Sequence, residues 1–234
     1  MAGITAIILA GGKGTRMQTE TPKQYLPLLG KPVLFYSLQA FSESEADSII
    51  LVVREQETEY CRKEIVEKYG FHKVTAIVPG GAERYHSVYQ GLLAAEGADY
   101  VLIHDGARPL IEPEIIRQAI CRVKKCGACV VGLPVQDTIQ LTDEENRITA
   151  TPDRRRVWAA QTPQCFSYSL IREAYERAQK AQDASLTDDA MVVKRYTDHP
   201  VEMIPGSSRN IKLTTPENLQ LVELWLGDTN CCSF

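Results

Sequence analysis

Residues 4–17 read ITAIILAGGKGTRM, and residues 22–25 continue with PKQY. The first six residues, apolar except for Thr5, predict a buried strand, whereas the next eight hold three glycines and two cations. Glycines at this point let the backbone turn sharply and point its N–H groups inward, because no Cβ stands in the way. A buried strand followed by such a turn predicts the first unit of an α/β sheet with an anion-binding loop at its end.

Three cations, Lys13, Arg16 and Lys23, face one nearby acid, Glu20, so the loop is a cationic nest suited to a polyphosphate. The alternative is a tight turn with solvated cations. The glycines alone are weak evidence, but a following arginine and a lysine behind a rigid proline make the pattern much more specific.

Two better-known glycine motifs do not match. A P-loop needs Ser or Thr directly after its lysine, and here Gly14 follows Lys13. A dinucleotide fingerprint needs a third glycine where Met17 stands and an acidic residue closing the second strand. That strand, residues 48–53, is followed by Arg54.

Composition indicates an ordinary globular chain. Its 234 residues, 44% hydrophobic and 24% charged, are enough for one large core. A net charge of −4 argues against a nucleic-acid partner, which requires a broad basic face. No run approaches 18 apolar residues and the N-terminus lacks a signal peptide, so we expect no membrane association and a cytoplasmic location.

Seven cysteines are an odd number, which favours reduced thiols. Cys121, Cys126 and Cys129 do not suggest zinc, because no fourth ligand accompanies them. The ending CCSF at 231–234 is a poor prenylation box, since Cys and Ser take its aliphatic positions. We expect residues 1–227 to form one domain and 228–234 a disordered tail.

Strand-like and helix-like segments alternate along the chain. Apolar runs typical of strands cover residues 4–9, 48–53, 74–78, 100–103, 129–135 and 201–204, with a further run at 158–166. Helices are expected at 32–41, 56–69, 84–95, 113–125, 167–181 and 188–195, and from Pro216 onward. This alternation predicts a mostly parallel sheet covered by helices on both faces, in three layers.

Residues 137–156 interrupt the alternation. Two short runs, 138–141 and 147–150, flank the turn 143–146 and predict a β-hairpin with few apolar residues. A lone hairpin is marginally stable in water, so this one should pack on a partner. We expect a dimerisation arm, with a flap on its own subunit as the alternative.

Ligands of open parallel sheets bind beyond the carboxyl ends of the strands. Polar residues and glycines follow these ends repeatedly, which predicts an active site there. The segments concerned are the cationic glycine loop, 79–87, 104–109, Asp137 with Thr138, and 206–212.

Each of these residues also has a plainer interpretation. Gly80 and Gly81 could form a simple turn, but we favour a rim that contacts a nucleobase, with Ser87 adding a hydroxyl. Asp105 could cap a helix, but beside several cations it is better placed to hold a hydrated Mg²⁺ against phosphates. We expect His104, at the end of a buried strand, to be structural.

Other cations suit a second anion. Arg108 lies where a second anionic ligand would bind. The run 154–156 is three arginines on the arm, which either form a solvated face or bind a phosphate. For Lys212 two interpretations have about equal weight, namely a contact with this second anion and an exposed side chain without a function.

Seven ordered motifs, covering residues 4–226, resemble the 2-C-methyl-D-erythritol 4-phosphate cytidylyltransferases. They are LAGGKGTRM (9–17) with PKQ (22–24), GGAER (80–84) with Ser87-Val88, HDGARP (104–109), PVQDT (134–138), QTPQ (161–164), TDDA (187–190) and NIK (210–212). The resemblance implies a Rossmann-like, glycosyltransferase-A-like nucleotidyltransferase fold. It also implies transfer of CMP from CTP to the sugar-alcohol phosphate, with Mg²⁺ or another divalent cation, in non-mevalonate isoprenoid synthesis.

The resemblance also implies roles for individual residues. Arg16 and Lys23 would hold the triphosphate and stabilise the transition state, and Arg154 and Lys212 would act on the acceptor. Nucleotide binding would involve Ala10, Gly11, Gly12, Gly14, Gly81, Ala82, Ser87 and Asp105. The acceptor and metal region would comprise Asp105, Arg108, Thr138, Thr162, Thr187 and Lys212, with Arg154 reaching in from the neighbouring subunit of a homodimer.

The acceptor is the least specific part of this prediction. Gly11 stands where many members have Ala, and LAGG is also common in sugar-nucleotide pyrophosphorylases and ribitol-5-phosphate cytidylyltransferases. D-ribitol 5-phosphate is therefore the alternative acceptor, and a non-catalytic nucleotide-binding module is a remote alternative. A phosphate monoester is already a nucleophile at pH 7, so catalysis should depend on cations and positioning, which fits a site rich in Arg and Lys.

Overall fold

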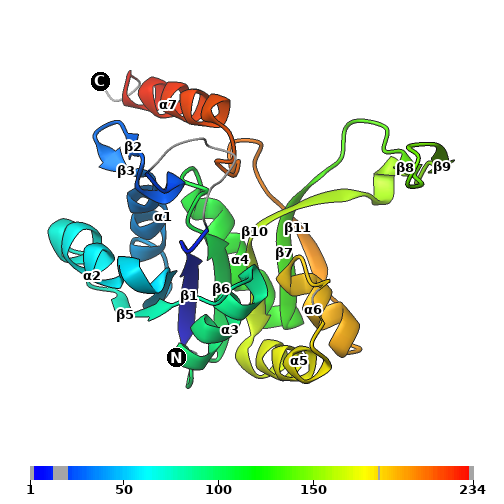
Figure 1. Ribbon diagram of the computed structural model, residues 1–234, viewed down its shortest axis with the longest axis horizontal. Coiled ribbons are helices and arrows are strands. Elements are labelled where there is room, and N and C mark those ends of the chain that lie inside the picture. The colour runs from blue at the N-terminus through cyan, green and yellow to red at the C-terminus, as the bar shows by residue number, and fades with distance from the viewer. Residues whose placement is uncertain (1–2, 13–20, 184, 232–234) are drawn as a thin grey trace.

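The computed structural model describes residues 3–12, 21–183 and 185–231, and these form a seven-stranded sheet with helices on both faces (Figure 1). The strand order is β11-β7-β10-β6-β1-β4-β5. The strands are β1 (Ile4–Leu9), β4 (Ser48–Val53), β5 (Val74–Pro79), β6 (Tyr100–Asp105), β7 (Ala128–Pro134), β10 (Trp158–Ser167) and β11 (Glu202–Pro205). Only β10 among them runs antiparallel to its neighbours, β6 and β7. The predicted three-layer, mostly parallel sheet is confirmed.

Alternate residues of the strands face two separate cores. In β1, Ala6 and Ile8 point to the side covered by α1 (Val33–Ser42) and α4 (Pro113–Cys126). Ile7 points to the other side, covered by α3 (Arg84–Ala94), α5 (Tyr168–Ala181) and α6 (Asp189–Tyr196). The continuous apolar run of β1 follows from this arrangement, because both faces of a covered parallel strand are buried.

The region expected as one helix over 56–69 contains three types of helix. It begins with a 3₁₀ turn, Glu55–Glu57, continues through α2 (Thr58–Tyr60) and passes into a π-helix, Cys61–Glu67. Pro32 is the N-cap of α1 and Pro113 lies in the first turn of α4, where a missing N–H costs nothing.

The carboxyl edge of the sheet is bordered by two short pieces of chain. A 3₁₀ turn at Lys23–Tyr25 leads into the small β2 (Pro27–Leu28) and β3 (Lys31–Pro32) ribbon. The last helix, α7 (Pro216–Cys231), packs over this ribbon through Leu28, Val33, Leu213 and Val222. Residues 228–231, expected as part of a tail, belong to α7, and residues 232–234 lie outside the described part.

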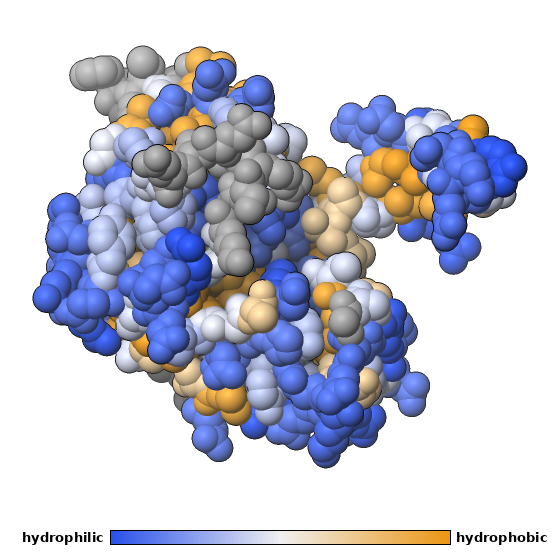
Figure 2. Space-filling model, in the orientation of Figure 1, coloured by the Kyte–Doolittle hydropathy of each residue, from blue (hydrophilic) through white to orange (hydrophobic). Residues whose placement is uncertain are grey.

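The predicted hairpin is present, with shorter strands than expected. β8 (Leu141–Thr142) and β9 (Ile148–Ala150) pair antiparallel, and Asn146 adopts φ +61° in the turn between them. The hairpin projects from β7 and β10, well away from the rest of its own chain (Figure 1). Its Leu141 and Ile148 side chains are exposed, and apolar surface is visible on the arm in Figure 2. The arm therefore does not lie as a flap on its own subunit.

In the described residues, no helix combines the length and the apolar character needed to span a bilayer.

Candidate functional site

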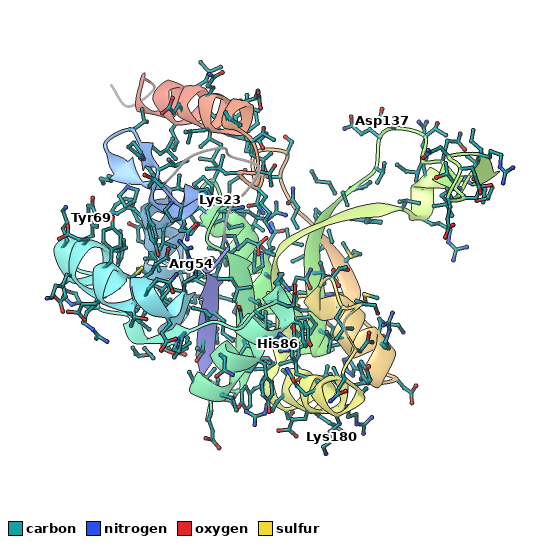
Figure 3. The ribbon with its side chains drawn as sticks, viewed as in Figure 1. Lys23, Arg54, Tyr69, His86, Asp137 and Lys180 are labelled. Atoms are coloured by element: carbon teal, nitrogen blue, oxygen red, sulfur yellow. The ribbon has the colours of Figure 1, made fainter. Side chains whose placement is uncertain are left out.

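A cavity of about 460 Å³ lies at the carboxyl ends of β1, β4, β5 and β6. This is the edge at which open parallel sheets bind ligands. Lys23 and Arg54 lie at the carboxyl end of β1 in Figure 3. The lining residues are Leu9, Ala10, Gly11, Gly12, Lys23, Gln24, Arg54, Gly81, Ala82, Glu83, Arg84, Ser87, Asp105, Ala107 and Lys212.

Asp105, the last residue of β6, is surrounded by three cations. The Nζ of Lys212 lies 2.8 Å from its Oδ2, and the Nε atoms of Arg84 and Arg108 lie 3.7 Å from its two carboxylate oxygens. Burial alone would raise the pKa of Asp105, but the three cations outweigh it and hold the pKa well below its usual range. The carboxylate is therefore ionised and leaves positive charge in excess around it, as an anionic ligand requires.

Arg84 is fixed by a second, fully buried carboxylate. Its two terminal nitrogens donate to the two oxygens of Asp189 at 2.8 and 2.7 Å, and the Tyr175 hydroxyl also donates to Asp189, at 2.5 Å. Burial lowers the pKa of Arg84, but the charge and hydrogen bonds of Asp189 more than offset this effect, so the net pKa is raised and the guanidinium stays charged. The pair ties the start of α3 to the start of α6, behind the cavity.

His104 and Thr162 position Asp105 from beneath. The backbone N–H of Asp105 donates to Thr162 Oγ1 at 3.1 Å, and the Thr162 hydroxyl lies 3.0 Å from His104 Nδ1. The other ring nitrogen lies 3.3 Å from the carbonyl of Arg108. These partners assign the proton to Nε2, and burial lowers the pKa of His104 to about 4. The structural role predicted for His104 agrees with this geometry.

The rim after β5 depends on glycines. A Cβ on Gly81 would lie 2.3 Å from the Cβ of His86, and one on Gly80 would lie 2.7 Å from Ser87 Oγ. The loop can therefore fold tightly over the start of α3, where the Gly81 N–H donates to Ser87 Oγ at 3.1 Å. The result is a narrow edge of backbone beside the cavity, as predicted for base recognition.

Two lysines, Lys23 and Lys212, line the side of the cavity opposite the glycine rim. Lys23 donates to the carbonyl of Leu213 at 3.0 Å, and the Leu213 N–H donates to the carbonyl of Ala107 at 2.8 Å. Asn210, fully buried, donates to the carbonyl of Thr162 at 2.8 Å and anchors the segment that carries Lys212.

The structure brings together nine of the predicted site residues, all of which line the cavity. They are Ala10, Gly11, Gly12, Lys23, Gly81, Ala82, Ser87, Asp105 and Lys212. Gly14 and Arg16 lie outside the described residues.

Five predicted acceptor residues do not line the cavity of this chain. Arg108 and Thr162 lie behind it, with Arg108 donating to the Asn210 carbonyl at 2.6 Å and Thr162 buried beneath Asp105. Thr138, Arg154 and Thr187 are exposed, the first two on the arm and the third ahead of α6. Within this chain, Arg108 and Thr162 hold neighbouring groups in place, and their contact with the acceptor stays a prediction.

The three arginines of the arm are not left to repel one another. Arg155 pairs with Asp153 at 2.7 Å, and Arg154 donates to the carbonyl of Gln136 at 2.9 Å. Arg154 therefore lies at the root of the arm, exposed to solvent.

Four polar residues of the cavity are absent from the residues predicted for the site: Gln24, Arg54, Glu83 and Arg84. Arg54 follows β4 directly, so the rule that located the other strand-end residues also applied to it. The Nε2 of Gln24 is buried and has no hydrogen-bond partner among the described residues, although Gln24 lines the cavity. An unpaired buried donor of this kind calls for a hydrogen-bond acceptor, such as a water or ligand oxygen.

The described residues contain no group of three or more His, Cys, Asp or Glu side chains that could hold a metal ion. Asp105 offers a carboxylate at the end of β6, where Lys212 already contacts one of its oxygens, and Glu83 lines the rim after β5. This set does not fit a metal held by protein ligands alone. It does fit Mg²⁺ that arrives with substrate phosphates, because Mg²⁺ commonly uses one or two carboxylates together with phosphate and water.

Comparisons with known proteins agree with this geometry. The family model described as 2-C-methyl-D-erythritol 4-phosphate cytidylyltransferase matches residues 4–228. Enzymes of that name from Lachnoclostridium phytofermentans and Lachnospira eligens are 47% and 48% identical, covering 97% and 95% of this chain and 98% of each relative.

A solved structure also has a similar fold. The crystal structure of 4-diphosphocytidyl-2C-methyl-D-erythritol synthase from Anaerococcus prevotii superposes with a TM-score of 0.84 at 33% identity, covering 97% of this chain and 96% of that one. The family match and these alignments cover nearly the whole length of the chain. The chain belongs to the 2-C-methyl-D-erythritol 4-phosphate cytidylyltransferase family.

Proposed function

We propose that this protein transfers a cytidylyl group from CTP to 2-C-methyl-D-erythritol 4-phosphate, releasing pyrophosphate, in isoprenoid precursor synthesis. The observation that carries the proposal is the cavity itself. A narrow glycine rim suited to a base lies on its β5 side, and Lys23, Arg84 and Lys212 supply cations toward β6. Five cysteines, Cys61, Cys121, Cys126, Cys129 and Cys165, are free thiols, which supports a reducing, cytoplasmic compartment.

The reaction is an in-line displacement at phosphorus. An oxygen of the acceptor phosphate attacks the α-phosphorus of CTP, the new P–O bond forms, and the bond to pyrophosphate breaks. Both reactants are anions, so the main barrier is their repulsion, and fixed cations lower it by meeting the charge that builds on the transferred group. Lys23 is placed for this task, and Arg16 would share it.

Mg²⁺ would supply further charge neutralisation on the triphosphate. Asp105 is the described carboxylate that would face it. Its position is fixed by the Thr162 hydroxyl and its ionisation by Arg84, Lys212 and Arg108. No general base is needed, and the low pKa and buried ring of His104 exclude it from that role.

Arg154, which the resemblance assigns to the acceptor, lies on the projecting arm and does not line the cavity of its own chain. We propose that two chains form a homodimer in which each arm, residues 137–156, completes the neighbouring site through Arg154, with Thr138 beside it. The exposed Leu141 and Ile148 would then be covered by the partner.

Subunit mixing tests this arrangement. Arg154→Ala and Lys23→Ala proteins, each nearly inactive, should recover part of the activity when exchanged, because mixed dimers contain one site with both residues intact. Light scattering that reports a monomer, or no recovery despite proven exchange, would contradict it.

The activity itself is tested by pyrophosphate release. The protein with CTP and Mg²⁺ should release pyrophosphate when 2-C-methyl-D-erythritol 4-phosphate is added and not in its absence. Lys212→Ala should reduce this rate strongly, whereas Lys124→Ala, on the exposed face of α4, should not. If no polyol phosphate supports release, the chain is a nucleotide-binding module.

A further inference from the structure

Arg54 occupies a defined place between the two loops that face the nucleotide. It follows β4, which lies between β1 and β5 in the sheet. The Ala10 N–H donates to the Val52 carbonyl and the Gly80 N–H to the Val53 carbonyl, both at 2.7 Å. The glycine loop and the glycine rim are thereby fastened on either side of Arg54, whose side chain lines the cavity (Figure 3).

The direction of the guanidinium is set by a small buried network. Nε of Arg54 donates to Glu57 Oε1 at 2.9 Å, and Nη2 contacts the same oxygen. The other oxygen of Glu57 accepts from the Tyr25 hydroxyl at 3.0 Å, and Glu57 is only 7% exposed. These contacts use one edge of the guanidinium. Among the described residues, none accepts a hydrogen bond from Nη1, which remains available to a ligand.

The position and the charge of Arg54 place the Nη1 edge of its guanidinium at the nucleoside half of CTP. The cations around Asp105 lie at the end of β6, two strands from β4, which is about 10 Å across the sheet. The positive charge of Arg54 is already matched by Glu57, so it adds less to triphosphate binding than Lys23 or Lys212. Its neighbour on the other side is the rim assigned to the base.

We infer that Arg54 is a specificity-determining residue that donates to the N3 and O2 edge of cytosine and so selects CTP over UTP. The inference rests on the proposed function. Cytosine presents two acceptors along this edge, whereas uracil presents a donor at N3. A guanidinium is a donor only, and it therefore satisfies the cytosine edge and meets the uracil N3–H unfavourably.

The experiment compares equilibrium binding and turnover of CTP and UTP in the wild type and three variants. Arg54→Met removes every donor, and Arg54→Lys keeps the charge but loses the planar fork. Arg117→Gln is the matched control, because Arg117 forms an exposed Arg–Glu pair with Glu114 on α4 away from the cavity. Since Arg54→Met leaves Glu57 buried without its partner, the double variant Arg54→Met/Glu57→Gln is measured beside it.

We expect kcat/KM for CTP to fall about 10- to 100-fold in Arg54→Met, mostly through KM, with little change for UTP. The double variant should show the same loss of discrimination, Arg54→Lys should recover little of it, and the control should match the wild type. Equal losses for both nucleotides that Arg54→Lys repairs would show a phosphate contact and overturn the inference, as would unchanged discrimination. A wild-type protein that releases no pyrophosphate from CTP would instead refute the proposed function, and binding selectivity in the variants would still test Arg54.

Discussion

Lowering the pH from 7 to 4.5 should destabilise this protein through His104. The ring is fully buried, and its hydrogen bonds to Thr162 and the Arg108 carbonyl use the neutral form. Between pH 6.5 and 4 the unfolded chain binds a proton on His104 that the folded chain does not, so stability falls as pH falls. The difference between the ordinary pKa of about 6.5 and the folded value of about 4 corresponds to about 3 kcal/mol.

Urea unfolding at pH 7, 5.5 and 4.5 measures this loss in the wild type, His104→Asn and His72→Gln. The asparagine retains an acceptor for the Thr162 hydroxyl but does not titrate, so its free energy of unfolding should fall much less over this range. His72 is exposed, and its variant should follow the wild type. Asp105, whose pKa is lowered, contributes a further loss only below its unfolded pKa of about 4. The reasoning is refuted if His104→Asn loses as much stability between pH 7 and 4.5 as the wild type.

Two further outcomes are expected. Lys23→Ala should lower kcat about 10²–10³-fold with little change in KM for CTP, because Lys23 meets charge that develops in the transition state. Steady-state kinetics measure both constants, and a change in KM alone would show that Lys23 contacts CTP only in the ground state. Asp189→Ala should cost about 3–5 kcal/mol in urea unfolding, because Arg84 and the Tyr175 hydroxyl lose their buried acceptor. The exposed control Glu114→Ala should cost less than about 1 kcal/mol, and equal losses in the two variants would contradict a structural role for the buried pair.

Most of the fold could be predicted because the strands are continuous apolar runs. β1, β4 and β6 are buried on both faces, so their sequences are largely apolar. The predicted strand 100–103 stopped short of His104 and Asp105, the polar residues that end β6. The π-helix at Cys61–Glu67 could not be predicted, since its buried residues, Cys61 and Ile65, have the spacing of an ordinary α-helix.

The site was predictable where residues directly follow strands. Asp105, Gly81 and Lys23 are brought to one cavity because parallel strands end at the same edge. The hydrogen bonds of Thr162 to Asp105 and His104 could not be predicted, because a threonine on a strand gives no sign of which neighbour its hydroxyl will contact. The buried partner of Arg84 could not be found either, since Asp189 is 105 residues away and meets it only in the folded chain.

The most direct test of the proposed activity is a side-by-side measurement of kcat/KM with CTP for two acceptors, 2-C-methyl-D-erythritol 4-phosphate and D-ribitol 5-phosphate. We predict a clear preference for the methylerythritol phosphate, with 4-diphosphocytidyl-2-C-methyl-D-erythritol identified as the product by mass spectrometry. A preference for ribitol phosphate, or pyrophosphate release with neither acceptor, would contradict the account.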